Sequence, residues 1–79
     1  MRVVTKLFAS LHSPKVQAGP GIPFDVQLPE GVTLADLVAL LRLPPEQVRV
    51  TFVNGRARPL DWVLQPEDQV GIFPPIGGG

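Results

Sequence analysis

Residues 24–45 read FDVQLPEGVTLADLVALLRLPP, and the spacing of the apolar residues changes once within this stretch. Over residues 24–28 apolar and polar residues alternate strictly, which is typical of a half-buried β-strand. Pro29-Glu30-Gly31 predicts a turn. Beyond this turn the apolar residues recur at helical spacing and form one stripe, made of Leu34, Leu37, Val38 and Leu41. The stretch therefore predicts a strand, a turn and one amphipathic helix.

The residues that flank this helix indicate where it begins and ends. Thr33 followed by Asp36 is a variant of the capping box, in which two side chains accept hydrogen bonds from the first turn. Pro44-Pro45 predicts that the helix ends at about Leu43, because the residue before a proline avoids helical backbone angles. The expected helix is thus about ten residues long, or three turns.

Two strands are predicted before the helix. Residues 2–9 are rich in β-branched and aromatic side chains, which is typical of a strand. Residues 10–22 contain two prolines and two glycines and predict a loop. The first two strands should therefore form a hairpin with a long connection.

Three more strands are predicted after the helix. Residues 48–53 form the first of them, and Asn54-Gly55 directly after it is a strong signal for a tight type I′ hairpin turn. The return segment, residues 56–60, contains Pro59, so its strand should be short or lie at an edge. After a turn at residues 65–68, residues 69–73 predict the final strand.

This order, β-β-α-β-β-β, decides the fold class. A single helix must cover one face of a single mixed sheet, and the other face is then largely solvated. The sequence thus predicts an α+β fold of the β-grasp (ubiquitin-like) type, a mixed sheet of about five strands with one main helix. We expect one domain at residues 1–73, followed by a flexible, extended C-terminal tail at residues 74–79.

The composition bounds the function. The chain has 79 residues, of which 44% are hydrophobic and 18% charged, with seven basic and seven acidic residues. This balance argues against nucleic acid and anionic membrane as partners, because both call for a basic surface. The chain has no cysteine, which excludes disulfides, thiolate catalysis and a cysteine-ligated iron–sulfur cluster. No signal peptide or membrane span is apparent, so a cytoplasmic location is the default expectation.

The tail carries the clearest chemical signal. The sequence ends in FPPIGGG, where two prolines favour an extended chain and three glycines present no side chain. Residues 74–79 could span roughly 20 Å, enough to carry a terminal carboxylate into the buried active site of another protein. A carboxylate attacking the α-phosphate of ATP gives an acyl-adenylate that reacts with sulfur nucleophiles. We therefore expect Gly79 to bear the reacting group and Gly77 and Gly78 to form the narrow tail. The alternative is a frayed end or a linker remnant.

Three segments also resemble a known family. FVNG at residues 52–55, PEGVTLADLVALL at 29–41 and IFPPIGGG at 72–79 resemble the MoaD/ThiS-type ubiquitin-like sulfur carriers. The resemblance covers nearly the whole chain, and its tail is the most specific part. FPPI is more similar to the small subunit of molybdopterin synthase than to the thiamine-pathway carrier.

The resemblance implies a cycle of reactions on the tail. A ubiquitin-activating-type adenylyltransferase would use ATP and magnesium to adenylate Gly79. A sulfurtransferase bearing a persulfide would then supply sulfur, leaving a C-terminal thiocarboxylate. The acceptor would be the large subunit of molybdopterin synthase or an equivalent enzyme. The chain itself would be no enzyme alone, and it would hold no permanent cofactor or metal.

Strand alternation predicts a surface for these partners. Lys6 should face water, which places Val4 and Phe8 on the same face, and Phe73 should point outward while Val70 and Ile72 are buried. On the third strand Val48, Val50 and Phe52 are expected on one face, and Arg49, Thr51 and Val53 on the outer face. The predicted patch on the helix-free face is therefore Val4, Phe8, Val53 and Phe73. In the resembled family the aromatic residues matching Phe8 and Phe73 face the partner enzyme. The alternative is that the tail or the loop at 10–22 covers them.

Other charged or polar residues carry weaker signals. His12 is a lone histidine in a loop, and Asp61, Glu67 and Asp68 are most simply turn and edge charges. Arg56 and Arg58 flank the hairpin and could contact an acidic partner. Trp62 is expected to close the core beneath the final turn.

Two function classes remain open. The first is a sulfur carrier, most simply for molybdopterin, with thiamine synthesis or tRNA thiolation as other pathways. The second is a ubiquitin-like protein modifier or a β-grasp interaction module whose tail has no chemistry. An interaction module needs no free glycine end, which argues against that alternative. A carrier and a modifier share the tail chemistry as far as the adenylate, so the sequence does not separate them.

Overall fold

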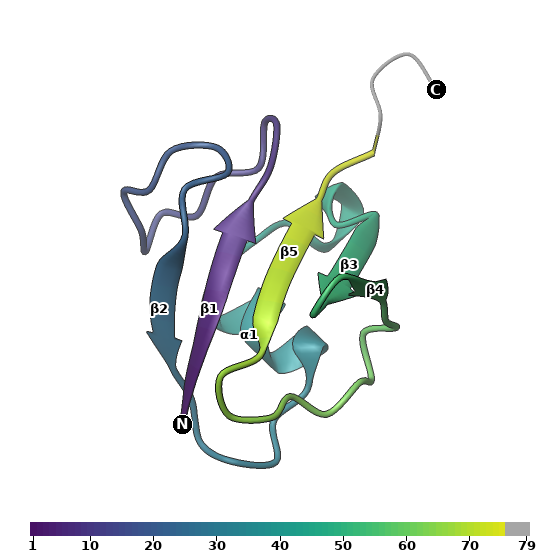
Figure 1. The fold of residues 1–79 in the computed structure, drawn as a ribbon. Helices are drawn as coiled ribbons and strands as arrows, with labels where there is room; N and C mark the ends of the chain where they lie inside the picture. Colours follow the sequence, from purple (N-terminus) through teal and green to yellow (C-terminus); the bar gives the residue numbers. More distant parts are fainter. Residues whose placement is uncertain (76–79) are drawn as a thin grey trace.

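The computed structural model describes residues 1–75, which form one helix-covered sheet (Figure 1). Its elements in chain order are β1 (Arg2–Leu7), β2 (Phe24–Gln27), α1 (Leu34–Leu40), the 3₁₀-helix η1 (Pro45–Gln47), β3 (Val50–Val53), β4 (Arg56–Ala57) and β5 (Gln69–Phe73). The strand order in the sheet is β2-β1-β5-β3-β4. This is the predicted β-grasp arrangement, with five strands and one α-helix among the described residues.

The sheet is mixed because the first and last strands lie side by side at its centre. β1 runs parallel to β5, with Thr5 opposite Val70, and antiparallel to β2. β5 runs antiparallel to β3, with Thr51 opposite Ile72. Figure 1 shows α1 behind the sheet, so the near face carries no helix. The predicted helical stripe is buried in the core between the two layers: Leu34, Leu37, Val38 and Leu41.

The predicted capping box begins α1. The backbone N–H of Asp36 donates to Thr33 Oγ1 at 3.2 Å, and the backbone N–H of Thr33 donates to Asp36 Oδ2 at 2.9 Å. The N–H groups of Leu34 and Ala35 donate to carbonyls of the segment before β5, at 3.0 and 2.9 Å. The first turn of the helix thus has its backbone donors satisfied, as the sequence predicted.

The helix ends earlier than Leu43, which corrects the sequence prediction. Its last residue is Leu40, and Arg42 has a positive φ of 55°. The N–H of Leu43 donates to the carbonyl of Val38 at 3.1 Å, and that of Arg42 to Ala39 at 3.0 Å, which is a Schellman motif. The left-handed residue of this motif is normally glycine or asparagine, so an arginine there gave no signal in the sequence.

The alternation of β3 is the opposite of the predicted one. Thr51 and Val53 are in the core, 5% and 3% exposed, whereas Phe52 is half-buried on the helix-free face and Val50 is exposed. Burial of Thr51 is tolerated because its hydroxyl donates to the carbonyl of Arg58 at 2.5 Å. Arg49 misled the prediction because it lies before the strand begins and does not share its alternation.

The hairpin after β3 agrees with the sequence. Asn54 and Gly55 have φ of 53° and 82°, which is the backbone of a type I′ turn. β4 has two residues and lies at the sheet edge, as expected from Pro59.

Among residues 1–75, no helix is long and apolar enough to cross a membrane.

Asp68 connects this hairpin to the turn before β5, and it is buried, unlike the turn charge expected from the sequence. One carboxylate oxygen accepts a hydrogen bond from the Asn54 amide at 2.9 Å, and the other accepts from the Gln65 N–H at 2.8 Å. The Asn54 side chain in turn accepts from the Gln69 N–H at 2.9 Å. Asp68 therefore holds the two turns at this end of the sheet together.

We expect Asp68→Ala to lower the free energy of unfolding by about 1–2 kcal/mol, because it leaves hydrogen-bond donors at both turns without their acceptor. Urea denaturation followed by circular dichroism measures this loss. Asp61→Ala is the matched control, since Asp61 is exposed and its change should stay within about 0.5 kcal/mol. An equal effect of the two substitutions would contradict a structural role for Asp68.

Candidate functional site: an aromatic face beside the tail

The tail leaves the domain from β5 at the centre of the sheet. β5 ends at Phe73 and is followed by Pro74 and Pro75 (Figure 1). Residues 76–79 lie outside the described part of the chain, so the roles expected for Gly77, Gly78 and Gly79 stay predictions. What the structure does describe is the surface from which the tail starts.

That surface carries three phenylalanine rings in contact. The rings of Phe8 and Phe73 stack with their centroids 4.2 Å apart and their planes 1° from parallel. Phe52 meets Phe73 edge-on, with centroids 5.5 Å apart and an interplanar angle of 78°. The edge-on arrangement of Phe52 and Phe73 is a favoured pairing of aromatic rings. Together with Val4 and Gly71, these rings form what we call the aromatic face.

The sequence predicted most of this face. Val4, Phe8 and Phe73 lie together on the helix-free side, as expected from the alternation of β1 and β5. Val53 does not belong to the face, because it points into the core. Its place is taken by its neighbour Phe52, which sequence reasoning assigned to the wrong side. The sequence held no signal for this, because burial of Thr51 depends on the hydrogen bond from its hydroxyl to the Arg58 carbonyl.

The long loop leaves this face partly open. Ser13 is buried, and its hydroxyl donates to the carbonyl of Leu41 at 2.6 Å, which fastens the loop to the end of the helix. Phe8 remains half-buried on the sheet, with Gly21 of the loop beside its ring. Residues 10–22 therefore border the aromatic face without covering it.

Gly71 is the floor of a hollow in the aromatic face. It lies on β5 between Val70 and Ile72, and a Cβ there would lie 3.3 Å from Cε2 of Phe8 and 3.6 Å from Cε1 of Phe73. The first distance is tighter than ordinary van der Waals contact. The missing side chain therefore lets the two rings lie stacked across the strand.

We expect Gly71→Ala to displace the Phe8 ring and to reduce its stacking on Phe73. Unfolding free energy should change by no more than about 1 kcal/mol, because a less flexible unfolded chain offsets part of the crowding. The measurement is the ring-current shift of the Phe8 and Phe73 protons by NMR. Gly19→Ala, whose Cβ would make an ordinary 3.8 Å contact with Ile22, should leave these shifts unchanged. Unaltered ring protons in Gly71→Ala would contradict the packing argument.

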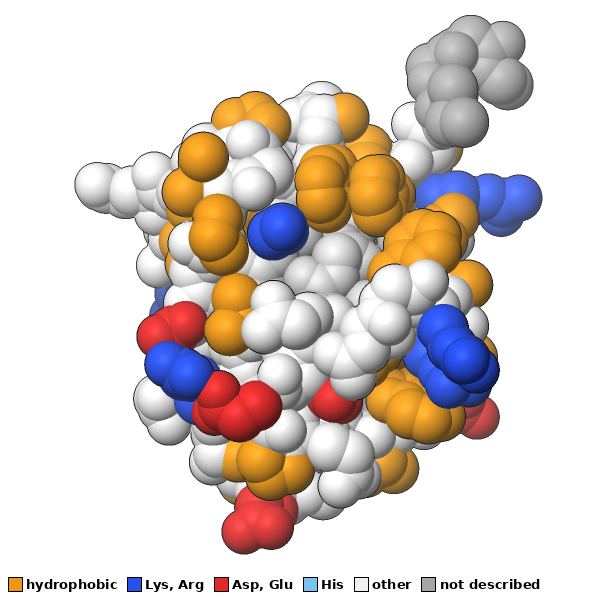
Figure 2. Space-filling view, in the orientation of Figure 1, with side chains coloured by type: hydrophobic (Ala, Val, Ile, Leu, Met, Phe, Trp, Pro, Cys, Tyr) orange, Lys and Arg blue, Asp and Glu red, His pale blue; other side chains and the backbone are white. Residues whose placement is uncertain are grey.

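Charges are unevenly distributed over the helix-free side. Figure 2 shows hydrophobic side chains gathered towards the end from which the tail leaves, and acidic side chains towards the opposite end. At that opposite end Arg2 pairs with Glu67 and, at 3.5 Å, with Asp25. The hydrogen bond from Arg2 lowers the pKa of the Glu67 carboxyl. Lys6 is the one charged residue that lines the hollow among the described residues, so a complementary partner would present acidic groups near it.

The aromatic face continues into a groove at the tail exit. Phe52 and Phe73 line both, and the groove adds Pro74 and Pro75 together with η1 and the start of β3.

Within residues 1–75 no group of three or more histidine, aspartate or glutamate side chains could hold a metal ion, and His12 is an exposed loop residue. The described part of this site therefore offers a binding surface.

Comparison with known proteins identifies a family whose model matches this chain and solved structures with a similar fold. The model of the ThiS family matches residues 15–79. A crystal structure of SAMP1 from Haloferax volcanii superposes with a TM-score of 0.67 at 24% identity, covering 100% of both chains. A second structure, of small archaeal modifier protein 1 from H. volcanii, has a TM-score of 0.69 at 22% identity, covering 95% of this chain and 98% of that one. At these identities the likeness concerns the fold alone.

A third structure is more similar in sequence. It is a protein from Pyrococcus furiosus assigned provisionally as molybdopterin converting factor, subunit 1. The identity is 29%, the TM-score is 0.67, and the match covers 95% of this chain and 98% of that chain. No protein with a curated function matches the sequence.

Proposed function

Because the chain belongs to the ThiS family, we propose that it is a sulfur carrier that works through the carboxylate of Gly79. A ubiquitin-activating-type enzyme adenylates this carboxylate with ATP and magnesium, and sulfur transfer then converts it to a thiocarboxylate. The acceptor we favour is a molybdopterin-forming enzyme. Supporting this choice are the FPPI segment before the glycines and the likeness to the P. furiosus protein.

The proposed chemistry proceeds by three substitutions. A carboxylate oxygen of Gly79 attacks the α-phosphorus of ATP, and pyrophosphate leaves. The terminal sulfur of a protein persulfide then attacks the acyl carbon, and AMP leaves. A thiol cleaves the resulting acyl disulfide and is itself oxidised to a disulfide, which releases the thiocarboxylate. A glycine at the reacting end keeps the acyl carbon accessible, because no side chain shields it.

One observation carries the proposal on the structural side: the aromatic face and the start of the tail share Phe73. This residue stacks on Phe8 and is followed directly by Pro74 and Pro75. A partner that covers the aromatic face is thereby positioned beside the tail. Exposed apolar patches of this kind commonly mark interaction sites, and buried aromatic residues often dominate binding energy.

The test is the intact mass of the protein isolated from its native cells. A thiocarboxylate replaces one oxygen by sulfur and adds about 16 Da. We expect this species, and we expect it to disappear on alkylation or on treatment with hydroxylamine. Only the unmodified mass, persisting after incubation with ATP, a cognate activating enzyme and a sulfur source, would overturn the carrier role.

A protein-modifier function is the second candidate. The reason for considering a modifier function is that the fold is similar to that of SAMP1, which is named as a modifier protein. Both functions pass through the same adenylate and differ in the nucleophile, which is sulfur for a carrier and a lysine amine for a modifier. Peptide mass spectrometry of cell extracts separates them, since a modifier leaves glycine remnants on lysine side chains of other proteins.

A further inference from the structure

A second groove lies at the edge of the sheet, away from the aromatic face, and it exists because β4 is short. The return segment follows β3 as far as Arg58, whose N–H donates to the Thr51 carbonyl at 2.8 Å. Beyond Arg58 the chain turns away from β3 at Pro59 and towards α1, where the Leu60 carbonyl accepts a hydrogen bond from the Ala35 N–H at 2.9 Å. The start of β3 therefore has no strand on this side, and its backbone pairs with β5 instead: Val50 lies opposite Phe73, and the Arg49 N–H donates to the Phe73 carbonyl at 2.9 Å.

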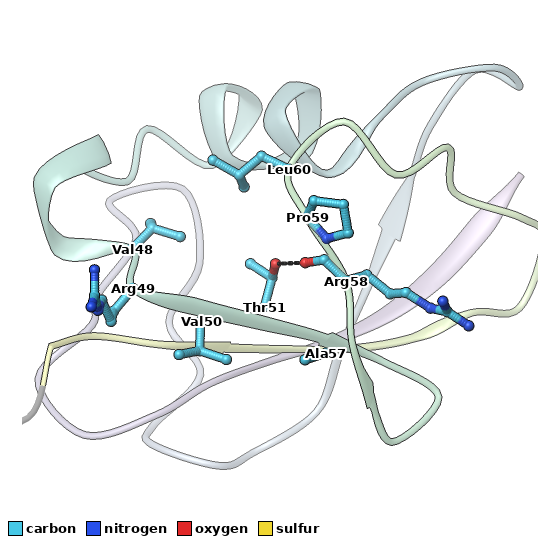
Figure 3. Close-up of a pocket in the computed structure, with 8 residues that line it drawn as sticks. All are labelled: Val48, Arg49, Val50, Thr51, Ala57, Arg58, Pro59 and Leu60. Carbon is cyan, nitrogen blue, oxygen red and sulfur yellow. Dashed lines mark hydrogen bonds between the residues drawn. The ribbon is translucent and has the colours of Figure 1, made fainter.

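Figure 3 shows this β3 edge groove, with Pro59 and Leu60 across from the start of β3. Its lining consists of Val48, Arg49, Val50, Thr51, Ala57, Arg58, Pro59 and Leu60. Val50 and Leu60 are large apolar residues that are nevertheless 37% and 42% exposed. None of the lining residues also lines the hollow of the aromatic face, but Val48, Arg49 and Val50 are shared with the groove at the tail exit, so the β3 edge groove adjoins that groove.

The charge of this edge has one sign. Arg49 and Arg58 line the groove, Arg56 lies next to its Ala57, and no acidic residue lines it. Within residues 1–75 the salt bridges all involve Arg2, so these three arginines have no ionic partner there. Arg58 is held in place because its guanidinium lies 4.1 Å above the ring of the half-buried Trp62. The edge thus presents fixed positive charge beside exposed apolar side chains.

We propose that the β3 edge groove binds an extended acidic peptide segment of a partner protein, recognised by the arginines and the exposed apolar side chains that line the groove. An extended strand alternates its side chains, so apolar residues can contact Val48, Val50 and Leu60 while acidic residues face Arg49 and Arg58. A nucleic acid fits less well, because the groove is largely apolar and the whole chain has no net charge.

The first test titrates the ¹⁵N-labelled full chain with a synthetic heptapeptide that alternates aspartate or glutamate with valine or isoleucine. We expect amide shift changes at residues 48–51 and 57–60. A matched peptide with lysine in place of every acidic residue should bind at least about tenfold more weakly. Shifts confined to the aromatic face, or equal binding of the acidic and basic peptides, would overturn the proposal.

The second test uses charge reversal. Arg49→Glu changes an exposed side chain that makes no hydrogen bond within residues 1–75, so the fold should survive. We expect it to weaken the acidic peptide about fivefold, and Arg49→Glu with Arg58→Glu about tenfold or more. Lys15→Glu, an equal charge change in the exposed loop before β2, should leave affinity unaltered. Equal affinities for Arg49→Glu, Lys15→Glu and the unchanged protein would overturn the assignment of the groove.

Discussion

A chain without Gly79 should yield less than about one hundredth of the thiocarboxylate formed by the full chain with the same activating enzyme and sulfur source. Deleting the residue withdraws the carboxylate by one residue, roughly 3.3–3.6 Å along an extended tail. A misplacement of about 1 Å can already cost about 10²-fold in a positioned reaction. Intact-mass spectrometry after a fixed incubation measures the fraction of product.

Gly77→Ala is the matched control for this deletion. It adds a side chain to the tail but leaves the length and the terminal glycine unchanged, so at least about a third of the product should remain by the same positioning argument. The midpoint of urea unfolding should be the same in all three proteins, since residues 1–75 are untouched. Normal product from the shortened chain would refute Gly79 as the reacting residue.

The second large effect separates two neighbouring residues of β3. Val53→Asp places a carboxylate in the core, where Val53 is 3% exposed and lies opposite Val70 of β5. An unpaired buried charge costs roughly 3–5 kcal/mol, which is comparable with the whole stability of a small domain. We therefore expect Val53→Asp to be largely unfolded by circular dichroism and by ¹⁵N–¹H correlation spectra.

Phe52→Asp should remain folded and lose its partner instead. Phe52 is half-buried on the helix-free side and meets Phe73 edge-on, so its replacement changes the aromatic face and leaves the core intact. Truncating a central aromatic contact typically weakens binding by about 2 kcal/mol or more, or about thirtyfold. Calorimetric titration with the activating enzyme measures this loss, and Phe8→Asp should behave in the same way.

The opposite pattern would restore the first interpretation of this strand. A folded Val53→Asp with weakened binding, together with an unfolded Phe52→Asp, would place Val53 on the surface. Unfolding of Phe8→Asp would likewise show that Phe8 belongs to the core and that the partner surface lies elsewhere.

Local structural features that require particular residues at particular backbone angles were predictable from the sequence. Asn54-Gly55 indicated a turn that needs two positive φ angles, and Thr33 with Asp36 indicated a capping box; the structure has both. The end of α1 was not predictable, because Arg42 adopts a left-handed conformation that usually requires glycine. Tertiary packing of Leu41 and Leu43, both buried, holds that turn in place.

The prediction of which face of β3 is buried failed for a different reason. Val50, Phe52 and Val53 are all apolar, so the sequence is compatible with burial of either face of the strand. The deciding contact is the hydrogen bond from Thr51 to the carbonyl of Arg58, which depends on where Pro59 turns the chain. Such a contact exists only once the hairpin has formed, and no spacing in the sequence encodes it.

The candidate site was therefore predictable in part. Alternation along β1 and β5 placed Val4, Phe8 and Phe73 on one side, because each strand has one clearly apolar face and Lys6 or Gln69 on the other. Phe52 and the role of Gly71 required the order of the strands. Only the pairing of β1 with β5 brings the ring of Phe8 over Gly71 and onto Phe73.

The central position of β5 also affects the point during folding at which the aromatic face forms and can bind a partner. β1 with β2, and β3 with β4, can pair as separate hairpins, but in the sheet of residues 1–75 β5 is the strand that joins these two halves. During synthesis this strand emerges after all the others, so the sheet closes late and through pairings distant in sequence. Before closure Phe8 has no Phe73 to stack on and the aromatic face does not exist. A partner that recognises this face would thus engage only completed molecules, and under the proposed function this recognition would act as a check on folding before the tail is modified.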